Sequence, residues 1–247
     1  HTGTDTIYFR DLWGKTKIQQ LAEPALYNKI SPTLEIGLPF TTQTASAVYL
    51  SWLRLLELFP ISFSGIKTSR DDVVVDIDRE RLVKRMEHYF DPAISHEEMH
   101  QIAPGAMDSN SGFQAEKVRD HLRKRGFLPQ NVVRYCYRPF DVRWLYWEPE
   151  TKLLDRNRAD YFPHVFVGNV WLCATQQNRK EFDPPIVTDN LGSLHLIERG
   201  ANLFPLYLKQ GMDIDRSVVE KRPNLSEKAK KYLEQCEVAE PDYLFYH

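Results

Sequence analysis

Cysteine is scarce in this chain, and its positions exclude two kinds of stabilised small domain. The 247 residues include three cysteines, Cys136, Cys173 and Cys236, which lie far apart and form no Cys-x-x-Cys pair. An odd and dispersed set argues against a disulfide framework and against a structural zinc site. We therefore expect reduced thiols, buried as small hydrophobic side chains, in a protein of the reducing cytoplasm.

Long apolar runs and nucleotide-binding loops are also lacking. No window approaches the roughly 18 consecutive apolar residues of a membrane span, and the N-terminus has no signal segment. Gly65 is separated from Lys67 by Ile66, so this stretch is not a P-loop, and no glycine-rich methyl-donor loop is present. No His-Glu-x-x-His or Gly-x-Ser-x-Gly motif occurs, and His96 and His100 lack a third ligand. The sequence thus predicts no membrane partner, no metal site and no catalytic residues of its own.

Charge is nearly balanced overall but uneven along the chain. The formal net charge is −2. Between residues 119 and 158, however, ten Lys or Arg residues face five Asp or Glu residues, which gives this segment a charge of +5. Aromatic residues, 12% of the chain, are interleaved with these arginines. Such a patch is typical of a surface that binds phosphates, although a solvated helix face has the same composition.

The periodicity of apolar residues predicts an α+β fold: a helical first half followed by a mostly antiparallel β region with a C-terminal helix. Helices are expected over 78–90, from the capping box at Ser95–Glu98, over 114–125 and from 224 to about 236. A strand is expected over 73–77, and residues 48–59 fit either a helix or a strand. Six β-like runs cover 132–137, 142–147, 164–174, 185–188, 193–198 and 203–208. We place a domain boundary at residues 50/51 and a possible sub-boundary near 104–112.

Four polar segments carry side chains suited to nucleic acid. Each lies in a predicted turn or beside a predicted strand, where Arg, Lys, Ser and Thr can reach phosphates and Arg, Asn and Gln can read base edges. Basic residues of the 114–125 helix add phosphate donors. The candidate DNA-binding residues are Lys67, Thr68, Ser69, Arg70, Arg123, Arg125, Arg143, Arg156, Asn157, Arg158, Gln176, Gln177, Asn178 and Arg179. Solvated loops are the plain alternative for these segments, and Arg138 pairing with Asp141 is a structural alternative within one of them.

Two short patterns suggest catalysis without completing a motif. Asp183-Pro184-Pro185-Ile186 resembles the Asp-Pro-Pro-aromatic motif of amino-methyltransferases, but its aromatic residue is missing. Asp141, Glu150 and Lys152 match the spacing of a Mg²⁺-dependent nuclease, but Pro149 places Glu150 in a turn. A nuclease built on these three residues therefore remains an alternative function, and a protein-interaction module using the aromatic strands is another.

Four stretches, in order along the chain, carry a family resemblance. These are 58–71, with Phe63-Ser64-Gly65-Ile66-Lys67-Thr68-Ser69-Arg70-Asp71 at its end, and then 137–144 (Tyr-Arg-Pro-Phe-Asp-Val-Arg-Trp), 154–156 and 204–208. Together they are similar to the region after the methyltransferase in Type ISP restriction-modification enzymes, and Asp11-Leu12-Trp13-Gly14 resembles the stretch before that region. The resemblance extends over nearly the whole chain.

The resemblance implies a role within a larger bacterial enzyme. Members of that family combine a nuclease, an ATP-driven translocase, an adenine methyltransferase and a C-terminal target-recognition domain. Residues 1–50 would then be a linker or the end of the methyltransferase side, and 51–247 the target-recognition domain. Its partners would be double-stranded DNA and the methyltransferase domain of the same polypeptide. The fragment would need no cofactor, whereas the parent would use S-adenosylmethionine, with ATP and Mg²⁺ in a full-length enzyme. The aromatic end, Leu244 to His247, also suggests a fragment.

Overall fold

The computed structural model describes residues 6–30, 46–175, 184–198, 200–211 and 220–246. Contacts between Cα atoms divide the chain into two units, residues 1–54 and 55–247. No division falls at 104–112, because residues on both sides of that segment share one hydrophobic core that includes Met99, Ala106 and Leu122.

The first unit holds a small antiparallel ladder and two short helices. Strand β1 (Ile7–Phe9) pairs with β2 (Asn28–Ile30), and α1 (Lys17–Ala22) lies between them in the chain. Helix α2 (Ala47–Ser51) ends at Trp52, whose backbone is extended. The apolar run 48–59 therefore forms two short helices, α2 and α3 (Leu55–Leu58), which belong to different units.

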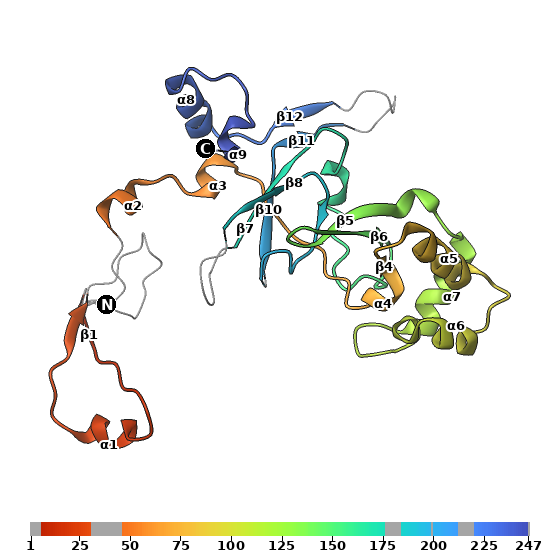
Figure 1. The fold of residues 1–247 in the computed structure, drawn as a ribbon, viewed down its shortest axis with the longest axis horizontal. Helices are drawn as coiled ribbons and strands as arrows, with labels where there is room; N and C mark the ends of the chain where they lie inside the picture. The colour runs from red at the N-terminus through yellow and green to blue at the C-terminus, as the bar shows by residue number, and fades with distance from the viewer. Residues whose placement is uncertain (1–5, 31–45, 176–183, 199, 212–219, 247) are drawn as a thin grey trace. The chain divides into compact units, whose positions relative to one another are not determined.

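An antiparallel sheet forms the centre of the second unit (Figure 1). Its strands are β3 (Phe63–Ser64), β7 (Trp171–Thr175), β8 (Ile186–Thr188) and β10 (Ala201–Pro205), in the order β3-β10-β7-β8. Successive side chains of a strand point to opposite faces. Trp171 and Cys173 accordingly enter the main core, and Leu172 and Ala174 enter a second core with Phe59 of the α3 end. Both faces of this sheet are buried.

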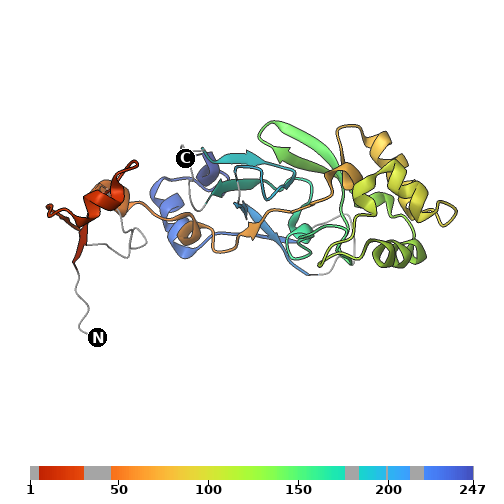
Figure 2. The ribbon, with the colours of Figure 1, turned by 90° about the horizontal axis from the view of Figure 1, so that it is seen from below.

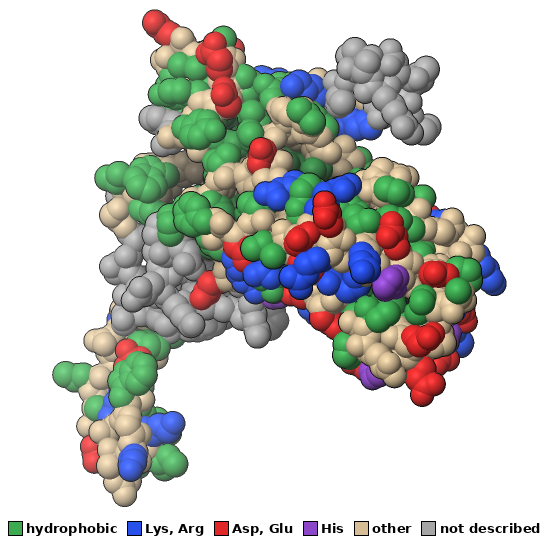
Figure 3. Space-filling view, turned by 45° about the vertical axis from the view of Figure 1, so that its right-hand side comes forward, with side chains coloured by type: hydrophobic (Ala, Val, Ile, Leu, Met, Phe, Trp, Pro, Cys, Tyr) green, Lys and Arg blue, Asp and Glu red, His purple; other side chains and the backbone are tan. Residues whose placement is uncertain are grey.

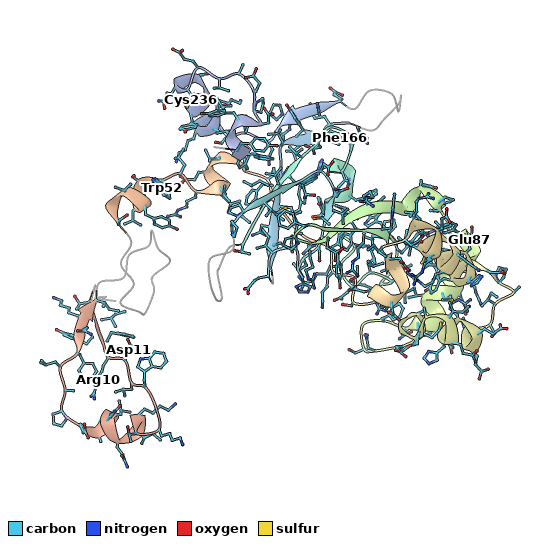
Figure 4. The ribbon with its side chains drawn as sticks, in the orientation of Figure 1. Arg10, Asp11, Trp52, Glu87, Phe166 and Cys236 are labelled. Carbon is cyan, nitrogen blue, oxygen red and sulfur yellow. The ribbon has the colours of Figure 1, made fainter. Side chains whose placement is uncertain are left out.

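A second sheet carries the helical layer. Its strands are β4 (Val75–Asp76), β5 (Val132–Arg138), β6 (Asp141–Tyr146) and β9 (Leu191–Gly192), in the order β4-β6-β5-β9, with only β5 and β9 parallel among these pairs. Helices α5 (Arg79–Phe90), α6 (His96–Ile102) and α7 (Ala115–Arg125) lie beside it (Figures 1 and 4). Their apolar residues Leu82, Met86 and Leu122 join Leu145 of β6 in the main core.

Local sequence signals explain where these helices begin and end. Asp78 accepts hydrogen bonds from the amides of Glu80 and Arg81 at the start of α5. The Ser95–Glu98 capping box opens α6, and Gly126, with φ of 86°, ends α7. The expected strand over 73–77 is only partly present: α4 (Asp71–Val74) occupies its first half, since two acidic residues begin a helical turn there.

The remaining elements complete the second unit. Strand β11 (Tyr207–Lys209) pairs with β12 (Lys221–Pro223), α8 (Glu227–Gln235) is capped by Ser226, and α9 (Tyr243–Tyr246) follows. Among the described residues, 3-10 turns occupy Pro104–Ala106, Pro129–Asn131 and Phe162–His164. The expected run 193–198 contains no strand, because its residues form turns after β9. The predicted α+β order, with a C-terminal helix, is confirmed.

All three cysteines are free thiols. Cys136 and Cys173 are buried thiols, whereas Cys236 is half-buried at the end of α8 (Figure 4). Burial raises the pKa of the Cys136 thiol. Within the residues that the structure describes, no helix is long and apolar enough to cross a membrane.

One backbone crossing joins the two sheets. The amide of Ile66 donates to the carbonyl of Gly192 at 3.0 Å, and the amide of Leu194 donates to Ile66 at 2.7 Å. A Cβ on Gly65 would lie 2.4 Å from the Leu194 nitrogen and the Ser193 carbonyl. A side chain at position 65 would therefore prevent the two backbone segments from approaching so closely. Gly65 does not have a positive φ, so this close approach is what requires glycine. This crossing brings the segment after β3 against the loop after β9.

Candidate nucleic-acid interface

A polar cleft of about 360 Å³ lies beside this crossing. The segment after β3, the start of α4, the end of β5 and the loop after β9 all contribute to it. Its lining consists of Ile66, Lys67, Thr68, Ser69, Asp71, Asp72, Tyr137, Arg138, Ser193 and His195, which we call the central cleft. Three of the predicted residues, Lys67, Thr68 and Ser69, are therefore brought together there.

The acidic side chains of the central cleft are occupied by hydrogen bonds. The Tyr137 hydroxyl donates to Asp71 at 2.6 Å, and the Thr68 hydroxyl donates to the same carboxylate. Asp72 accepts from the Gly105 amide at 2.9 Å. The hydrogen bond to Asp71, followed by burial, raises the pKa of Tyr137. The Tyr137–Asp71 contact joins β5 to the start of α4.

Lys67 and Ser69 share one carboxylate at the edge of the cleft. The Lys67 ammonium lies 2.5 Å from Asp155, and the Ser69 hydroxyl donates to Asp155 at 3.2 Å. The hydrogen bond from Lys67 lowers the pKa of Asp155, although burial opposes this. Lys67 also bridges to Arg156 through two backbone hydrogen bonds of 2.9 and 3.2 Å. The turn that carries Arg156 is thereby held at the cleft.

Two arginines stack on one tyrosine next to the cleft. The guanidinium carbons of Arg138 and Arg143 lie 4.5 and 4.1 Å from the centroid of the Tyr137 ring. Arg143 forms an ion pair with Asp141 at 2.7 Å, and the hydrogen bonds of this pair raise the pKa of Arg143 and lower that of Asp141. The expected alternative pairing of Arg138 with Asp141 is wrong, because Asp141 is taken by Arg143 two residues along β6.

Three arginines of the basic segment are exposed and have no acidic partner among the described residues. Arg134, Arg138 and Arg156 are exposed, and within the described residues none has a carboxylate within ion-pair distance. Arg134 instead lies 4.9 Å above the Trp144 ring. Figure 3 shows that Lys and Arg side chains gather on one face of the molecule with acidic side chains among them. Cations that are not neutralised within the protein are the ones that can neutralise phosphates.

Arg70 lies behind the cleft rather than in it. Its side chain is buried, with the guanidinium carbon 3.4 Å from the Phe113 ring centroid. The same group donates to the carbonyls of Lys152 and Leu153 at 3.1 Å each. Burial lowers the pKa of Arg70. Because every one of these contacts serves the fold, the placement does not fit the phosphate contact that the sequence predicts.

Arg123 and Arg125 lie at the end of α7, where they bind the protein itself. Arg123 donates to the carbonyl of Ile94 and forms an ion pair of 3.4 Å with Asp120. Arg125 contacts the fully buried carboxylate of Glu148 at 2.6 and 3.0 Å. Burial would lower the pKa of Arg125, but the hydrogen bond to Glu148 and the nearby negative charges of Glu148 and Glu150 together raise it. Both arginines thus make contacts within the protein, and their role as phosphate contacts stays a prediction.

The two residues after Arg156 also make contacts within the protein or are partly buried. The Asn157 side chain donates to the carbonyl of Pro149, and the backbone carbonyl of Asn157 accepts from the Trp147 indole at 2.7 Å. Arg158 is half-buried and has a positive φ of 53°. The predicted contacts Gln176, Gln177, Asn178 and Arg179 lie outside the described residues, as does Asp183 of the Asp-Pro-Pro-Ile pattern.

The geometry does not favour a nuclease built on Asp141, Glu150 and Lys152. Asp141 begins β6, whose five residue steps extend about 17 Å to Tyr146, and Glu150 follows the end of that strand. Asp141 is paired with Arg143, and Glu150 lies 3.2 Å from Arg125. Across the described part of the chain, no group of three His, Cys, Asp or Glu residues could hold a metal ion. His96 and His100 instead face Asp120 and Asp108.

Comparison with protein families assigns this architecture. Residues 57–247 match the Type ISP C-terminal specificity domain. The chain belongs to this family. No curated protein matches it.

Solved structures repeat the fold of this family member at low sequence identity. A structure of ATP-dependent Type ISP enzyme LlaBIII bound to DNA matches 84% of the chain at 17% identity, with a TM-score of 0.59. A cryo-EM structure of a DrdV–DNA complex matches 83% at 18% identity (TM-score 0.55). A nuclease-deletion mutant of LlaGI with a DNA substrate mimic matches 84% at 16% identity (TM-score 0.53). The chain spans only 14 to 20% of the length of these proteins.

Sequence reasoning missed several residues that the fold brings to the same surface. The charge of the basic segment does not single out Arg134 or Arg138 as contacts, and no motif in the sequence includes His195. Arg138 precedes the Pro139-Phe140 turn, so its exposure at a strand end could have been inferred. No sequence signal links His195 to Lys67, because only the crossing at Gly65 brings them together.

Proposed function

We propose that this specificity domain recognises a sequence in double-stranded DNA through the central cleft and its arginine rim. The rim consists of Arg138, which lines the cleft, and Arg156, which is hydrogen-bonded to Lys67 of its lining. The observation that carries the proposal is that these arginines are exposed and unneutralised around a polar cleft of a Type ISP C-terminal specificity domain. The DNA-bound state of the LlaBIII, DrdV and LlaGI structures supports it.

Two kinds of contact would divide the work. Arg138, and Arg134 further along β5, would bind phosphates and fix the register of the domain on the duplex, whereas Lys67, paired with Asp155, would hold the turn that carries Arg156. Arg156, on a turn held to Lys67 by backbone hydrogen bonds, would read a base edge, for which arginine favours guanine. Arg143 would support Arg138 through the shared Tyr137 ring. Of the residues predicted on the loop after β7, Gln176, Gln177, Asn178 and Arg179 remain candidate base contacts.

The chemistry that follows recognition would lie in the rest of the parent polypeptide. We propose that a methyltransferase domain of the same chain is the partner and that it uses S-adenosylmethionine. ATP and Mg²⁺ would serve a full-length parent rather than this domain, which would carry no catalytic residue. The cytoplasm, where bacterial DNA lies, would be its location.

A salt titration tests this proposal directly. Fluorescence anisotropy of the 247-residue chain on random-sequence duplexes should show binding that weakens steeply with salt. Arg138→Ala should lower the slope of log K against log salt by about one, as loss of a phosphate contact does. Lys231→Ala, which removes one exposed positive charge from α8, is the matched control and should leave the slope unchanged.

Selection of preferred sites from a pool of random duplexes separates sequence-specific recognition from nonspecific electrostatic binding. Arg156→Ala should lower affinity for the selected site by roughly 1–3 kcal/mol and relax the preference at one base pair. Absence of binding at low salt, or binding insensitive to salt, would contradict the proposal and favour the protein-interaction alternative.

A further inference from the structure

The turn of the β5–β6 hairpin presents an aromatic ring to solvent. Phe140 is 100% exposed, and Arg138 and Pro139 beside it are exposed as well. Its φ is 63°, a conformation that bulky side chains rarely adopt. Figure 2 shows this hairpin, in green, extending away from helices α5–α7 to its turn. Phe140 thus contributes nothing to either hydrophobic core, so neither packing nor backbone preference explains a phenylalanine there.

The hairpin beneath Phe140 is held firmly. Strands β5 and β6 pair from Val132–Tyr146 to Arg138–Asp141, with a bulge between Cys136 and Arg138. Asp141, the next residue after Phe140, is clamped by Arg143 through bonds of 2.7 and 3.0 Å. Tyr137 ties the same end of the hairpin to Asp71 of α4. A ring on so constrained a turn needs little ordering when it meets a partner.

The charges around the ring select the partner. Arg138 precedes the turn and lacks an acidic partner within the described residues, and Arg143 stacks on the same tyrosine. An apolar groove of a protein would bury a broader patch than one ring and would have to desolvate Arg138. A base step offers a flat apolar slot flanked by phosphates, which complements both the ring and the guanidinium.

We propose that Phe140 is a wedge that inserts between neighbouring base pairs of the bound duplex, while Arg138 contacts a phosphate beside that step. This inference rests on the proposed DNA-recognition function and adds a second mode of reading to it. Insertion unstacks the step and bends the duplex, and pyrimidine–purine steps yield most easily. Phe140 would therefore favour certain steps without a hydrogen bond to any base.

The test uses duplexes selected by the 247-residue chain from a random pool, with 2-aminopurine placed at successive positions. Binding of the unaltered chain should raise 2-aminopurine fluorescence at one step, because unstacking relieves quenching. Phe140→Ala should abolish that rise and weaken binding at least about fivefold, the lower end of the effect of base–aromatic stacking. The salt slope should stay unchanged, because no cation is removed.

Two control variants separate the wedge from general effects. Val167→Ala, at another fully exposed apolar residue, should leave both fluorescence and affinity unchanged. Phe140→Trp should keep the fluorescence rise. Salt-dependent binding without a rise, or a rise that persists in Phe140→Ala, would overturn the wedge and leave the proposed function intact. Loss of all DNA binding by the unaltered chain would instead overturn the proposed function, and the wedge with it.

Discussion

The ion pair between Arg125 and Glu148 makes a quantitative prediction about the basic segment. The guanidinium contacts both carboxylate oxygens, at 3.0 and 2.6 Å, and the Glu148 side chain is 0% exposed. The Glu150 amide also donates to Glu148, at 2.8 Å. Replacing Arg125 with alanine leaves the buried carboxylate with this single amide donor. We therefore expect Arg125→Ala to destabilise the fold rather than to weaken a DNA contact.

Removal of one partner from a buried ion pair destabilises a protein by about 3–5 kcal/mol. In a domain of this size, each kcal/mol lowers the melting temperature by about 2–4 °C, so a fall of about 6–20 °C is expected. Thermal and urea unfolding of Arg125→Ala measure it. Lys124→Ala is the matched control, because Lys124 is its exposed neighbour on α7 and has the same charge. It should shift stability by less than about 0.5 kcal/mol.

A double variant, Arg125→Met with Glu148→Met, should recover most of the loss because it removes the uncompensated charge. The reasoning is refuted if Arg125→Ala unfolds like the unaltered chain while its DNA-binding salt slope falls by about one. Arg125 would then be the phosphate contact that the sequence suggests, and its pairing with Glu148 would be energetically unimportant.

Two further predictions concern the backbone crossing and the edge of β4. Gly65→Ala should destabilise the fold by about 3 kcal/mol or more in urea unfolding, because its Cβ would lie 2.4 Å from backbone atoms. Gly112→Ala is the control, because its Cβ would meet only one atom, at 3.6 Å. Equal effects of the two substitutions would refute the requirement for glycine at position 65. Burial would raise the pKa of Asp76, but the Asp78 amide and the Arg85 guanidinium lower it below its usual value. Its contribution is therefore present above the unfolded pKa of about 3.9 and is lost as pH falls through the folded value. Asp76→Asn should be less stable than the unaltered chain at pH 7, and this difference should shrink in acid; a constant difference would contradict the assignment.

Helix ends were the most predictable part of the fold because they depend on neighbouring residues. Asp78, Ser95 and Gly126 satisfy backbone groups within a few residues of themselves, so sequence alone locates them. Sheet order was not predictable in this way. Strand β9 pairs with β5 from more than fifty residues away, and this pairing depends on the close approach at Gly65 rather than on any local pattern.

The contact residues were harder to predict than the basic segment that contains them. The burial of Arg119 could have been predicted, because Arg119 shares the helical spacing of the buried residues Ala115 and Leu122. Its guanidinium donates to the carbonyls of Tyr89 and Ser95 at 2.9 Å each, and burial lowers its pKa to about 10. An arginine on the apolar face of a predicted helix is thus a poor candidate for a phosphate contact.

For the other arginines, the deciding partners come from distant parts of the chain. Arg125 is neutralised by Glu148 beyond the end of β6, and Arg70 is covered by Phe113 and by carbonyls near residue 153. Neither partner can be predicted from the spacing of residues in the sequence. The net charge of +5 therefore gives the excess of basic over acidic residues, but it does not say which basic residues are free to bind phosphates. Only the folded chain shows that Arg138 and Arg156 are exposed without an acidic partner among the described residues, whereas the charge of Arg125 is paired with Glu148. If phosphates are bound by unneutralised cations, single substitutions across residues 119–158 should divide sharply into those that change stability and those that change the salt dependence of DNA binding.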